Sequence, residues 1–502
     1  MYLRWDFKMK NFPEETSVNE KSILSYHLMH PGGDSQPGDP NVAFCIDGTY
    51  HLHYILRHHW QNSSPRKSTS QVPFEHSYSF IHVTSDDMLH WNWQKTKLQQ
   101  SFTGHGMYSG TGFMTKDGKP AAIYHGQGSE RNFIAIAKDK MLSEWEKPYS
   151  LEPVKKDGSK VEMRHWDPDC FLINNTYYAI SGGREQPLIK SQDLVNWNYV
   201  GDFLKHEIAD VAIGEDISCP NFFQIGDKWM LLCISHPFGC RYYLGDWDSE
   251  NEQFIPETHR RMNWPRPEQS IYETTFRDFF APESVLTTDG RRVMWAWLRG
   301  EDVSDRTIQS LPRELNLAED GSLRIRPLRE LEALRYDQIT MNDITVTPPE
   351  APHSNHLTEW ITDLDGDAFE IKIMIDRQQA TRKRFSIQLF ADDNHPGLPI
   401  MIHPELSRLR IGNTEAPFAV DELPAGEDLE LRIFIDKYLV EVFANEQQAL
   451  LTTCMEYQAA KGLHMYVYGD PTTIRQIQIW KMKVTNQGFM EAMRNRIWAP
   501  ET

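Results

Sequence analysis

The chain has little cysteine and no apolar segment long enough to cross a membrane. Its six cysteines, spread over 502 residues, include no C-x-x-C pair, which argues against a disulfide framework and against a cysteine zinc site. No apolar run approaches the ~18 residues of a membrane span, and the N-terminus lacks the apolar segment of a signal peptide. We therefore expect a cytoplasmic protein, or a secreted or periplasmic one if a signal peptide has been removed.

Basic residues are also scarce relative to acidic ones. The 52 lysines and arginines against 71 aspartates and glutamates give a net charge of -19. This balance argues against nucleic acid and anionic membranes as partners, because both require a basic surface. A neutral or cationic small-molecule ligand fits the charge. The 15 tryptophans suit both the packing of strands and stacking on sugar rings.

Helical periodicity is rare, whereas short apolar runs separated by glycine, proline, asparagine and aspartate are frequent. Such runs are typical of the strands of an all-β protein. The clearest of them are residues 50–54, 80–83, 121–124, 133–137, 229–235 and 293–297. The pattern changes after residue 335, and strand-like alternation resumes at 368–376, 385–390, 429–436, 438–445 and 463–469.

Two internal repeats indicate the architecture. A short segment ending in tryptophan recurs at Trp91, Trp145 and Trp197, and apolar runs open near residues 40, 110, 168, 220 and 282. A repeat of roughly 50–60 residues with several strands per unit is typical of a β-propeller. The sequence therefore predicts a five-bladed β-propeller catalytic domain over residues 1–340 and a C-terminal β-sandwich domain over residues 341–502. Residues 487–502 are expected to contain a short helix.

Acidic side chains lie beside these strand openings. Asp39 and Asp167 each precede the proline of an opening, and Glu283 follows one. In a propeller the innermost strands converge on one axis, so we expect carboxylates at the starts of different inner strands to face one another across a pocket.

Six motifs in this order resemble glycoside hydrolase family 32, the invertase, levanase and inulinase family, over nearly the whole chain. Each motif alone is weak, whereas six in the family's order at plausible spacing are specific. They are Gly38-Asp39-Pro40-Asn41 with Asp47 to Leu52, His82 to Trp91, Tyr108-Ser109-Gly110-Thr111, Trp166-Asp167-Pro168, Ser310 to Leu315, and Leu431 to Asp436 with Leu439 to Phe443.

The resemblance implies hydrolysis of β-fructofuranosyl bonds with retention of configuration, in sucrose, fructooligosaccharides, inulin or levan. Such chemistry uses two carboxyl groups about 5–5.5 Å apart. One attacks the anomeric carbon, and the other has a raised pKa and protonates the leaving oxygen. By the match, Asp39 is the nucleophile, and Asp167 binds sugar hydroxyls and stabilises the oxocarbenium-like transition state.

The acid/base residue is where the sequence departs from the family. The family pattern is E-C-P, but Ser218 stands at the glutamate position here, and a serine hydroxyl is too weak an acid for this role. Asp216 shares a strand face with Ser218, because residues two apart point the same way. Glu215 has the longer reach, and Gly214 would allow a bulge that re-aims it. The sequence does not separate these two, and Glu283 is a third candidate for which substrate binding is favoured.

The residues around the sugar depart as well. Trp166 replaces the arginine usual before the second Asp-Pro, with Arg164 two residues upstream as a shifted positive contact, and Gly38 and Val42 replace family residues in the first motif. Substrate preference is therefore the least transferable property. The predicted substrate-binding residues are Asn41, Trp60, Tyr108, Ser109, Arg164, Trp166, Ser218, Cys219 and Glu283.

Neither a cofactor nor a metal is expected. A group of histidines occurs in the first third of the chain, without helical i, i+4 spacing and without a flanking carboxylate motif, so a metal site is disfavoured. These histidines are His51, His53, His58, His59, His76 and His82.

Three other functions fit the same sequence. A fructosyltransferase would use the same machinery with another acceptor, a carbohydrate-binding protein could keep the pocket without the acid, and an arabinofuranosidase could share the scaffold. In each case the ligand is a small furanoside or an oligosaccharide, which for the favoured function contains fructofuranosyl units. The second domain either braces the first or covers the pocket of a partner copy in a homodimer, and the sequence favours neither.

Overall fold

The computed structural model describes residues 23–31, 38–57, 78–205, 208–212, 214–265, 277–300, 308–349, 358–381, 383–486 and 488–498. The described chain is mostly strand, so the predicted all-β class is confirmed. Each apolar run expected from the sequence lies within a strand, to within one residue at its ends, and the expected C-terminal helix is α3, Phe489–Asn495. No helix in these residues is long and apolar enough to cross a membrane.

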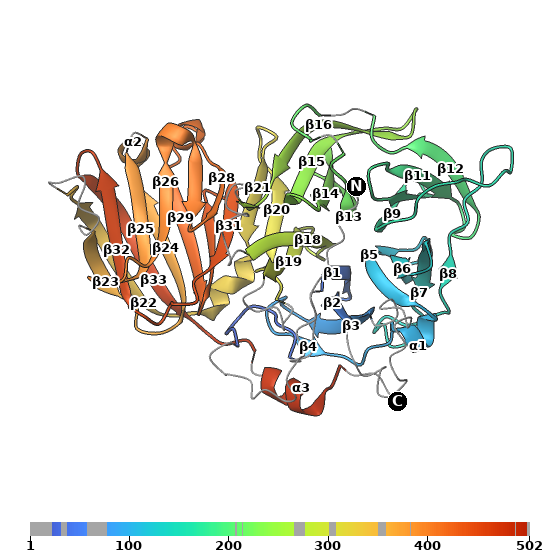
Figure 1. Cartoon of the computed structure of the whole chain (residues 1–502), viewed down its shortest axis with the longest axis horizontal. Coiled ribbons are helices and arrows are strands. Elements are labelled where there is room, and N and C mark those ends of the chain that lie inside the picture. Colours follow the sequence, from blue (N-terminus) through green and yellow to red (C-terminus); the bar gives the residue numbers. More distant parts are fainter. Residues whose placement is uncertain are drawn as a thin grey trace, which may run out of the picture.

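The N-terminal part of the described chain forms five antiparallel four-stranded sheets, which Figure 1 shows with their first strands toward a common centre. The first strands contact one another in sequence, β1 with β5, β5 with β9, β9 with β13 and β13 with β18, and β18 returns to β1. The strands are β1 Pro40–Ile46, β2 Thr49–Arg57, β3 Tyr78–Ser85, β4 Asn92–Trp93, β5 Gly106–Met114, β6 Pro120–Gln127, β7 Arg131–Ile136, β8 Tyr149–Ser150, β9 Pro168–Ile173, β10 Thr176–Ser181, β11 Pro187–Ser191, β12 Trp197–Asp202, β13 Ser218–Ile225, β14 Lys228–Ser235, β15 Gly239–Asp248, β16 Gln253–Arg261, β18 Arg277–Leu286, β19 Arg292–Gly300, β20 Arg313–Leu317 and β21 Leu323–Pro327.

Apolar side chains hold neighbouring sheets together face to face. Phe44 and Ile55 of the first sheet join Tyr124 of the second in one buried cluster, and equivalent clusters join the second sheet to the third and the third to the fourth. Burial of a large apolar side chain stabilises by about 1.5–3 kcal/mol. The alternation of apolar residues in the sequence therefore fixes how the sheets stack around the centre.

The C-terminal part of the chain forms two larger antiparallel sheets that share one apolar core. Their order is β22-β33-β24-β29-β30-β31 and β17-β28-β27-β26-β25-β32-β23. The strands are β17 Trp264–Pro265, β22 Arg335–Val346, β23 Glu359–Asp363, β24 Ala368–Ile375, β25 Arg384–Ala391, β26 Leu398–His403, β27 Arg408–Ile411, β28 Thr414–Pro417, β29 Leu429–Asp436, β30 Leu439–Ala444, β31 Gln448–Thr453, β32 Gly462–Tyr468 and β33 Thr472–Met482. Short helices α1 Gln100–Thr103, α2 Arg377–Ala380, η4 Arg329–Leu334, η5 Pro404–Leu406 and η6 Val420–Glu422 connect strands.

A buried charged cluster joins these two parts of the chain. Glu441 on β30 accepts hydrogen bonds from Arg313 Nη2 on β20 at 2.8 Å and from the Leu311 backbone N–H at 2.9 Å. His27 lies between Glu441 and Asp436, at 3.3 Å and 2.8 Å. The side chains of all four charged residues are fully buried. Two motifs that are far apart in the sequence, residues 310–315 and 439–443, therefore meet in this cluster.

Three buried histidines pack together between β2 and β3. The rings of His53 and His82 stack at 4.4 Å, and His51 Nδ1 lies 2.9 Å from His82 Nε2. Burial lowers the pKa of His51 to about 4 and that of His53 to about 3, and it lowers the pKa of His82 as well. Among the described residues there is no cluster of three or more side chains suited to hold a metal, and His58, His59 and His76 lie outside them.

This histidine stack predicts a loss of stability in acid. A histidine whose pKa is lowered on folding binds its proton more readily in the unfolded chain, so stability is full above pH 6.5 and falls as the pH drops below it. At pH 5 each such histidine costs about 2 kcal/mol. Urea unfolding at pH 7.5 and at pH 5 measures this fall, which should be smaller in His82→Gln than in the wild type. An equal fall in both proteins would contradict the account.

Candidate active site

The innermost strands begin with distortions that re-aim their side chains. The register of β1 shifts between Asn41 and Phe44, and similar shifts occur near the starts of β5, β13 and β18. Val42, Cys219 and Ala281 adopt positive φ angles of 46°, 47° and 44° at three of these places. Bulges turn a strand end locally and are frequent beside active sites. These bulges explain why the side chains of polar residues near the strand openings do not alternate between the two faces of the sheet.

A set of buried polar side chains links each first strand to the next. Asn41 on β1 accepts from the Gly110 backbone N–H of β5 at 2.8 Å. Thr111 donates to Asp169 at 2.6 Å, and Asp169 accepts from the Phe222 N–H of β13 at 2.6 Å. Two further contacts close the set: Asn221 Nδ2 with Glu283 at 3.3 Å, and the Ala43 N–H with Glu283 at 3.1 Å. The bonds satisfy buried polar atoms and fix the spacing of the strands.

The position of Glu283 does not suit the predicted roles of substrate binding or proton donation. Its residue is 1% exposed, and both carboxylate oxygens are engaged between strands. Burial raises its pKa well above the usual range. Asn41, another predicted substrate-binding residue, is similarly 1% exposed and bonds to backbone on both sides. Both residues therefore brace the strands beneath the site.

Asp39 and Asp167, predicted to share one pocket, flank a single thiol. Cys219 Sγ lies 3.8 Å from Asp39 Oδ2 and 3.6 Å from Asp167 Oδ2, and the Cys219 backbone N–H donates to Asp167 at 3.2 Å. Ser109 Oγ donates to Asp39 Oδ2 at 2.5 Å. Four residues in or directly before the first strands of four sheets thus converge, although 180 residues separate Asp39 from Cys219. This placement suits one carboxylate that attacks and a second that steadies developing charge.

The electrostatics of the two carboxylates are coupled. Burial, followed by the negative charge of Asp39, raises the pKa of Asp167 to about 6. Asp167 is therefore ionised at neutral pH but accepts a proton in mild acid. Burial also raises the pKa of the Cys219 thiol, so this thiol stays protonated and acts as a weak hydrogen-bond donor rather than as a nucleophile.

Aromatic rings form a connected series beside the carboxylates. Tyr108, 37% exposed, stacks against His125 at 6.0 Å, and His125 contacts Trp166 at 5.9 Å. Trp166 in turn contacts His236 at 6.4 Å, and His236 contacts Phe280 at 6.0 Å. Such surfaces can stack on sugar rings. His125 and His236 were not singled out from the sequence, since neither stands in a recognisable motif.

Arg164 and Trp60 complete the predicted set. Arg164 lies over the Trp166 ring, 4.9 Å from its centroid, in an exposed position. A cation over an aromatic face is favourable, so the Trp166 ring holds the Arg164 guanidinium beside the predicted site. Trp60 lies outside the described residues.

Glu215, one candidate for the acid, is held by two arginines. Arg261 Nη1 and Nη2 donate to its two oxygens at 2.6 and 2.9 Å, and Arg241 Nη1 lies 2.9 Å away. Burial, the largest single cause, would raise the pKa of Glu215, but the hydrogen bonds from Arg261, the Ser235 hydroxyl and the charge of Arg241 together outweigh it and lower the pKa to about 2. The side chain is fully buried, so Glu215 has neither a proton to give near neutral pH nor access to substrate.

Asp216, the other candidate, is paired with a histidine. His236 Nδ1 lies 2.6 Å from Asp216 Oδ2, and the His236 backbone N–H donates to Asp216 Oδ1 at 3.0 Å. Ser218 Oγ donates to Asp216 at 2.8 Å and accepts from Trp166 Nε1 at 2.9 Å. Burial, the largest single cause, would raise the pKa of Asp216, but the hydrogen bonds and charge of His236 together with the bond from Ser218 outweigh it and lower the pKa to about 2. The expectation that Asp216 and Ser218 point the same way agrees with their contact.

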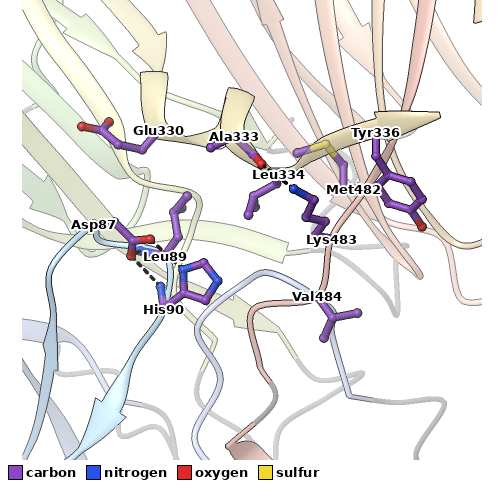
Figure 2. A pocket seen from close by; sticks show the side chains of 10 residues that line it. All are labelled: Asp87, Leu89, His90, Glu330, Ala333, Leu334, Tyr336, Met482, Lys483 and Val484. Carbon is purple, nitrogen blue, oxygen red and sulfur yellow. Dashed lines mark hydrogen bonds and ion pairs between the residues drawn. The ribbon is translucent and has the colours of Figure 1, made fainter. Parts of the chain in front are cut away.

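A separate hollow lies away from these residues. Its volume is about 550 Å³, and Figure 2 shows it between the turn after β3, the helix η4 and the end of β33. Its charged groups are already engaged: Asp87 binds His90, Glu330 binds Arg291, and Lys483 donates to the Ala333 carbonyl. This hollow therefore lacks the converging carboxylates that distinguish the site at Asp39.

Two family models match most of the chain. The model of the glycosyl hydrolases family 32 N-terminal domain matches residues 36–327. The model of the glycosyl hydrolases family 32 C-terminal region matches residues 330–481.

Individual proteins are similar over nearly the same span. A raffinose invertase of Escherichia coli is 25% identical over 499 residues, covering 91% of this chain and 94% of its own. A levanase of Bacillus subtilis is 25% identical, covering 89% of this chain and 68% of its own. The crystal structure of fructan 1-exohydrolase IIa from Cichorium intybus superposes with a TM-score of 0.68 at 17% identity, covering 93% of this chain and 98% of that one.

Proposed function

Because this chain belongs to glycosyl hydrolases family 32, we propose that it hydrolyses β-fructofuranosyl bonds in sucrose, fructooligosaccharides or fructans with retention of configuration. The observation that carries the proposal is the contact of Asp39 and Asp167 with one thiol, that of Cys219. A raffinose invertase and a levanase among the similar proteins support the same substrate class.

The proposed scaffold is the five-bladed β-propeller, within residues 1–340, followed by the β-sandwich, within residues 341–502. The contacts that run from β1 through β5, β9, β13 and β18 back to β1 support a closed arrangement of blades. The two matched segments, of which one ends at residue 327 and the other begins at residue 330, support a division of the chain into two domains, with a junction slightly before residue 340. The charged cluster of Glu441 then braces the propeller against the sandwich.

In the proposed reaction Asp39 attacks the anomeric carbon of the fructosyl unit as the bond to the leaving oxygen breaks, and the leaving oxygen takes a proton. Water then attacks the same carbon and releases the Asp39 carboxylate. Asp167 stays ionised above about pH 6, so its negative charge is available to stabilise the oxocarbenium-like transition state. Ser109 donates to Asp39 and holds its carboxylate in position.

A panel of substrates tests this proposal. The wild-type protein should release fructose from sucrose, 1-kestose, inulin or levan and release no arabinose from arabinofuranosides, as measured by chromatography of the free sugars. Release of arabinose alone would indicate the other furanosidase function. Binding of fructans without release of any sugar would indicate a carbohydrate-binding protein, and transfer of fructose to a sugar acceptor without free fructose would indicate a transferase.

A further inference from the structure

We propose that His236, oriented by Asp216, is the proton donor and acceptor of the reaction, taking the place of the carboxylic acid that the family has at position 218. This inference rests on the proposed function, because it assigns a role within the same site. A poor leaving group such as a sugar hydroxyl needs a proton as its bond breaks, so the site requires a proton donor.

The three carboxylates that the sequence offers as candidates for the acid do not meet that requirement. Glu215 is ionised and fully buried between Arg241 and Arg261. Glu283 is 1% exposed and engaged between strands. Asp216 is ionised and already accepts bonds from His236 and Ser218.

His236 has the geometry of a general acid. It follows β14 directly, so it lies at the same end of its sheet as Ser218, which pairs with Ile234. Its side chain is 52% exposed, and its ring lies against Trp166 and Phe280 in the aromatic series beside the carboxylates. No hydrogen bond to its Nε2 occurs among the described residues, whereas Nδ1 is engaged by Asp216. The free ring nitrogen is thus the one able to reach a substrate oxygen.

The pair with Asp216 fixes the tautomer. In the charged ring both nitrogens carry protons, with Nδ1–H bonded to the Asp216 carboxylate and Nε2–H available. The C–O bond breaks with its electron pair leaving on the oxygen, which takes the Nε2 proton, while Asp39 bonds to the anomeric carbon. The neutral ring keeps Nδ1–H on Asp216, so Nε2 can accept a proton from the water that displaces Asp39.

The surrounding charges favour the protonated ring. Burial alone would lower the pKa of His236, but Asp216, then Asp167 and Asp39, raise it. The nearby cations act elsewhere: Arg241 donates to the Asp216 carbonyl and Arg164 lies over Trp166. The acid form therefore persists to a pH above the usual 6.5 of histidine and is lost as the pH rises further.

Ser218 acquires a positioning role in this arrangement. Its hydroxyl is fully buried and connects Trp166 Nε1 to Asp216. A glutamate at this position would add a second negative charge against Asp216. Serine at position 218 is therefore compatible with the His236–Asp216 pair, and in this proposal His236 takes over the role of the family's glutamate.

Two substrates separate proton donation from other effects. His236→Gln should lower kcat/KM on sucrose by about 10²–10⁴-fold, yet lower kcat/KM far less on p-nitrophenyl β-fructofuranoside, whose leaving group needs no proton. The ratio kcat/KM reports the step that breaks the C–O bond and not the later attack by water. The alkaline fall of kcat/KM in the wild type should disappear in His236→Gln. Asp216→Asn, which leaves the His236 ring in place, should shift that fall to lower pH.

The control is His90→Gln, which removes a similar histidine–aspartate pair at 2.6 Å. This variant should cleave both sucrose and p-nitrophenyl β-fructofuranoside as the wild type does.

The outcomes distinguish the two proposals. If the wild-type protein cleaves neither fructoside, the proposed function itself fails. If it cleaves both, and His236→Gln retains the wild-type kcat/KM on sucrose or lowers kcat/KM equally on both substrates, then His236 is not the proton donor. Should His236→Gln fail to fold, an unchanged alkaline limb in folded Asp216→Asn would equally overturn the inference.

Discussion

Asp39→Asn is expected to abolish fructose release, with kcat at least ~10⁴-fold below the wild type. An amide cannot form the ester that the attacking carboxylate forms, although it has nearly the same shape. The substitution also removes the charge that, after burial, raises the pKa of Asp167. The Asp167 pKa should therefore fall as activity is lost. Fructose release from sucrose at saturating concentration measures the effect.

Asp47→Asn is the matched control for this variant. Asp47 follows the other end of β1, and its side chain is 71% exposed in an ion pair with Lys140. Neither activity nor the thermal midpoint should change, because an exposed pair contributes at most about 1 kcal/mol. If Asp39→Asn kept more than a hundredth of wild-type activity while folded, another nucleophile would be required.

Glu441→Gln is expected to destabilise the protein by about 3–5 kcal/mol, because it leaves buried positive charge without its partner. The substitution removes the carboxylate that Arg313 and His27 share. It changes the packing little, because the glutamine side chain has nearly the same size as the glutamate side chain. The free energy of unfolding in urea, with activity recorded beside it, measures the loss. A loss below about 1 kcal/mol would contradict the structural role assigned to the cluster.

A partly exposed ion pair between the same two parts of the chain provides the comparison. Glu446 pairs with Arg326 at 2.6 Å, and the two side chains are 32% and 43% exposed. Glu446→Gln should lower the free energy of unfolding by less than about 1 kcal/mol, since solvent screens the pair.

The pH dependence of stability also distinguishes the cluster of Glu441 from the Glu446–Arg326 pair. Burial alone would lower the pKa of His27, but Asp436 and Glu441 raise it to about 9, so the contribution of this histidine is full below pH 6.5 and is lost as the pH rises to about 9.

The sequence predicts the strands and the two aspartates because both depend on local patterns. Alternating apolar residues bury one face of a strand wherever it packs, and an aspartate beside a strand-opening proline stays at the strand end. The sequence therefore predicts that Asp39 and Asp167 share a pocket. The contacts of both with Cys219 agree with that placement.

The surroundings of the other carboxylates depend on residues distant in sequence. Glu215 receives its charge partner from Arg261 on β16, and Glu283 is engaged by Ala43, which is 240 residues away in the sequence. No local pattern signals either pairing. His236 was missed for the same reason: it stands in an ordinary turn, and only the return of β14 beside β13 brings it to Asp216.

The most direct test of the account is mass spectrometry of enzyme quenched in acid during turnover of a fructoside. The account predicts a fructosyl adduct on the peptide that contains Asp39, absent from Asp39→Asn and removed when the substrate is exhausted. An adduct on another residue would contradict the role given to Asp39. Inversion of configuration in the released sugar would contradict the covalent route altogether.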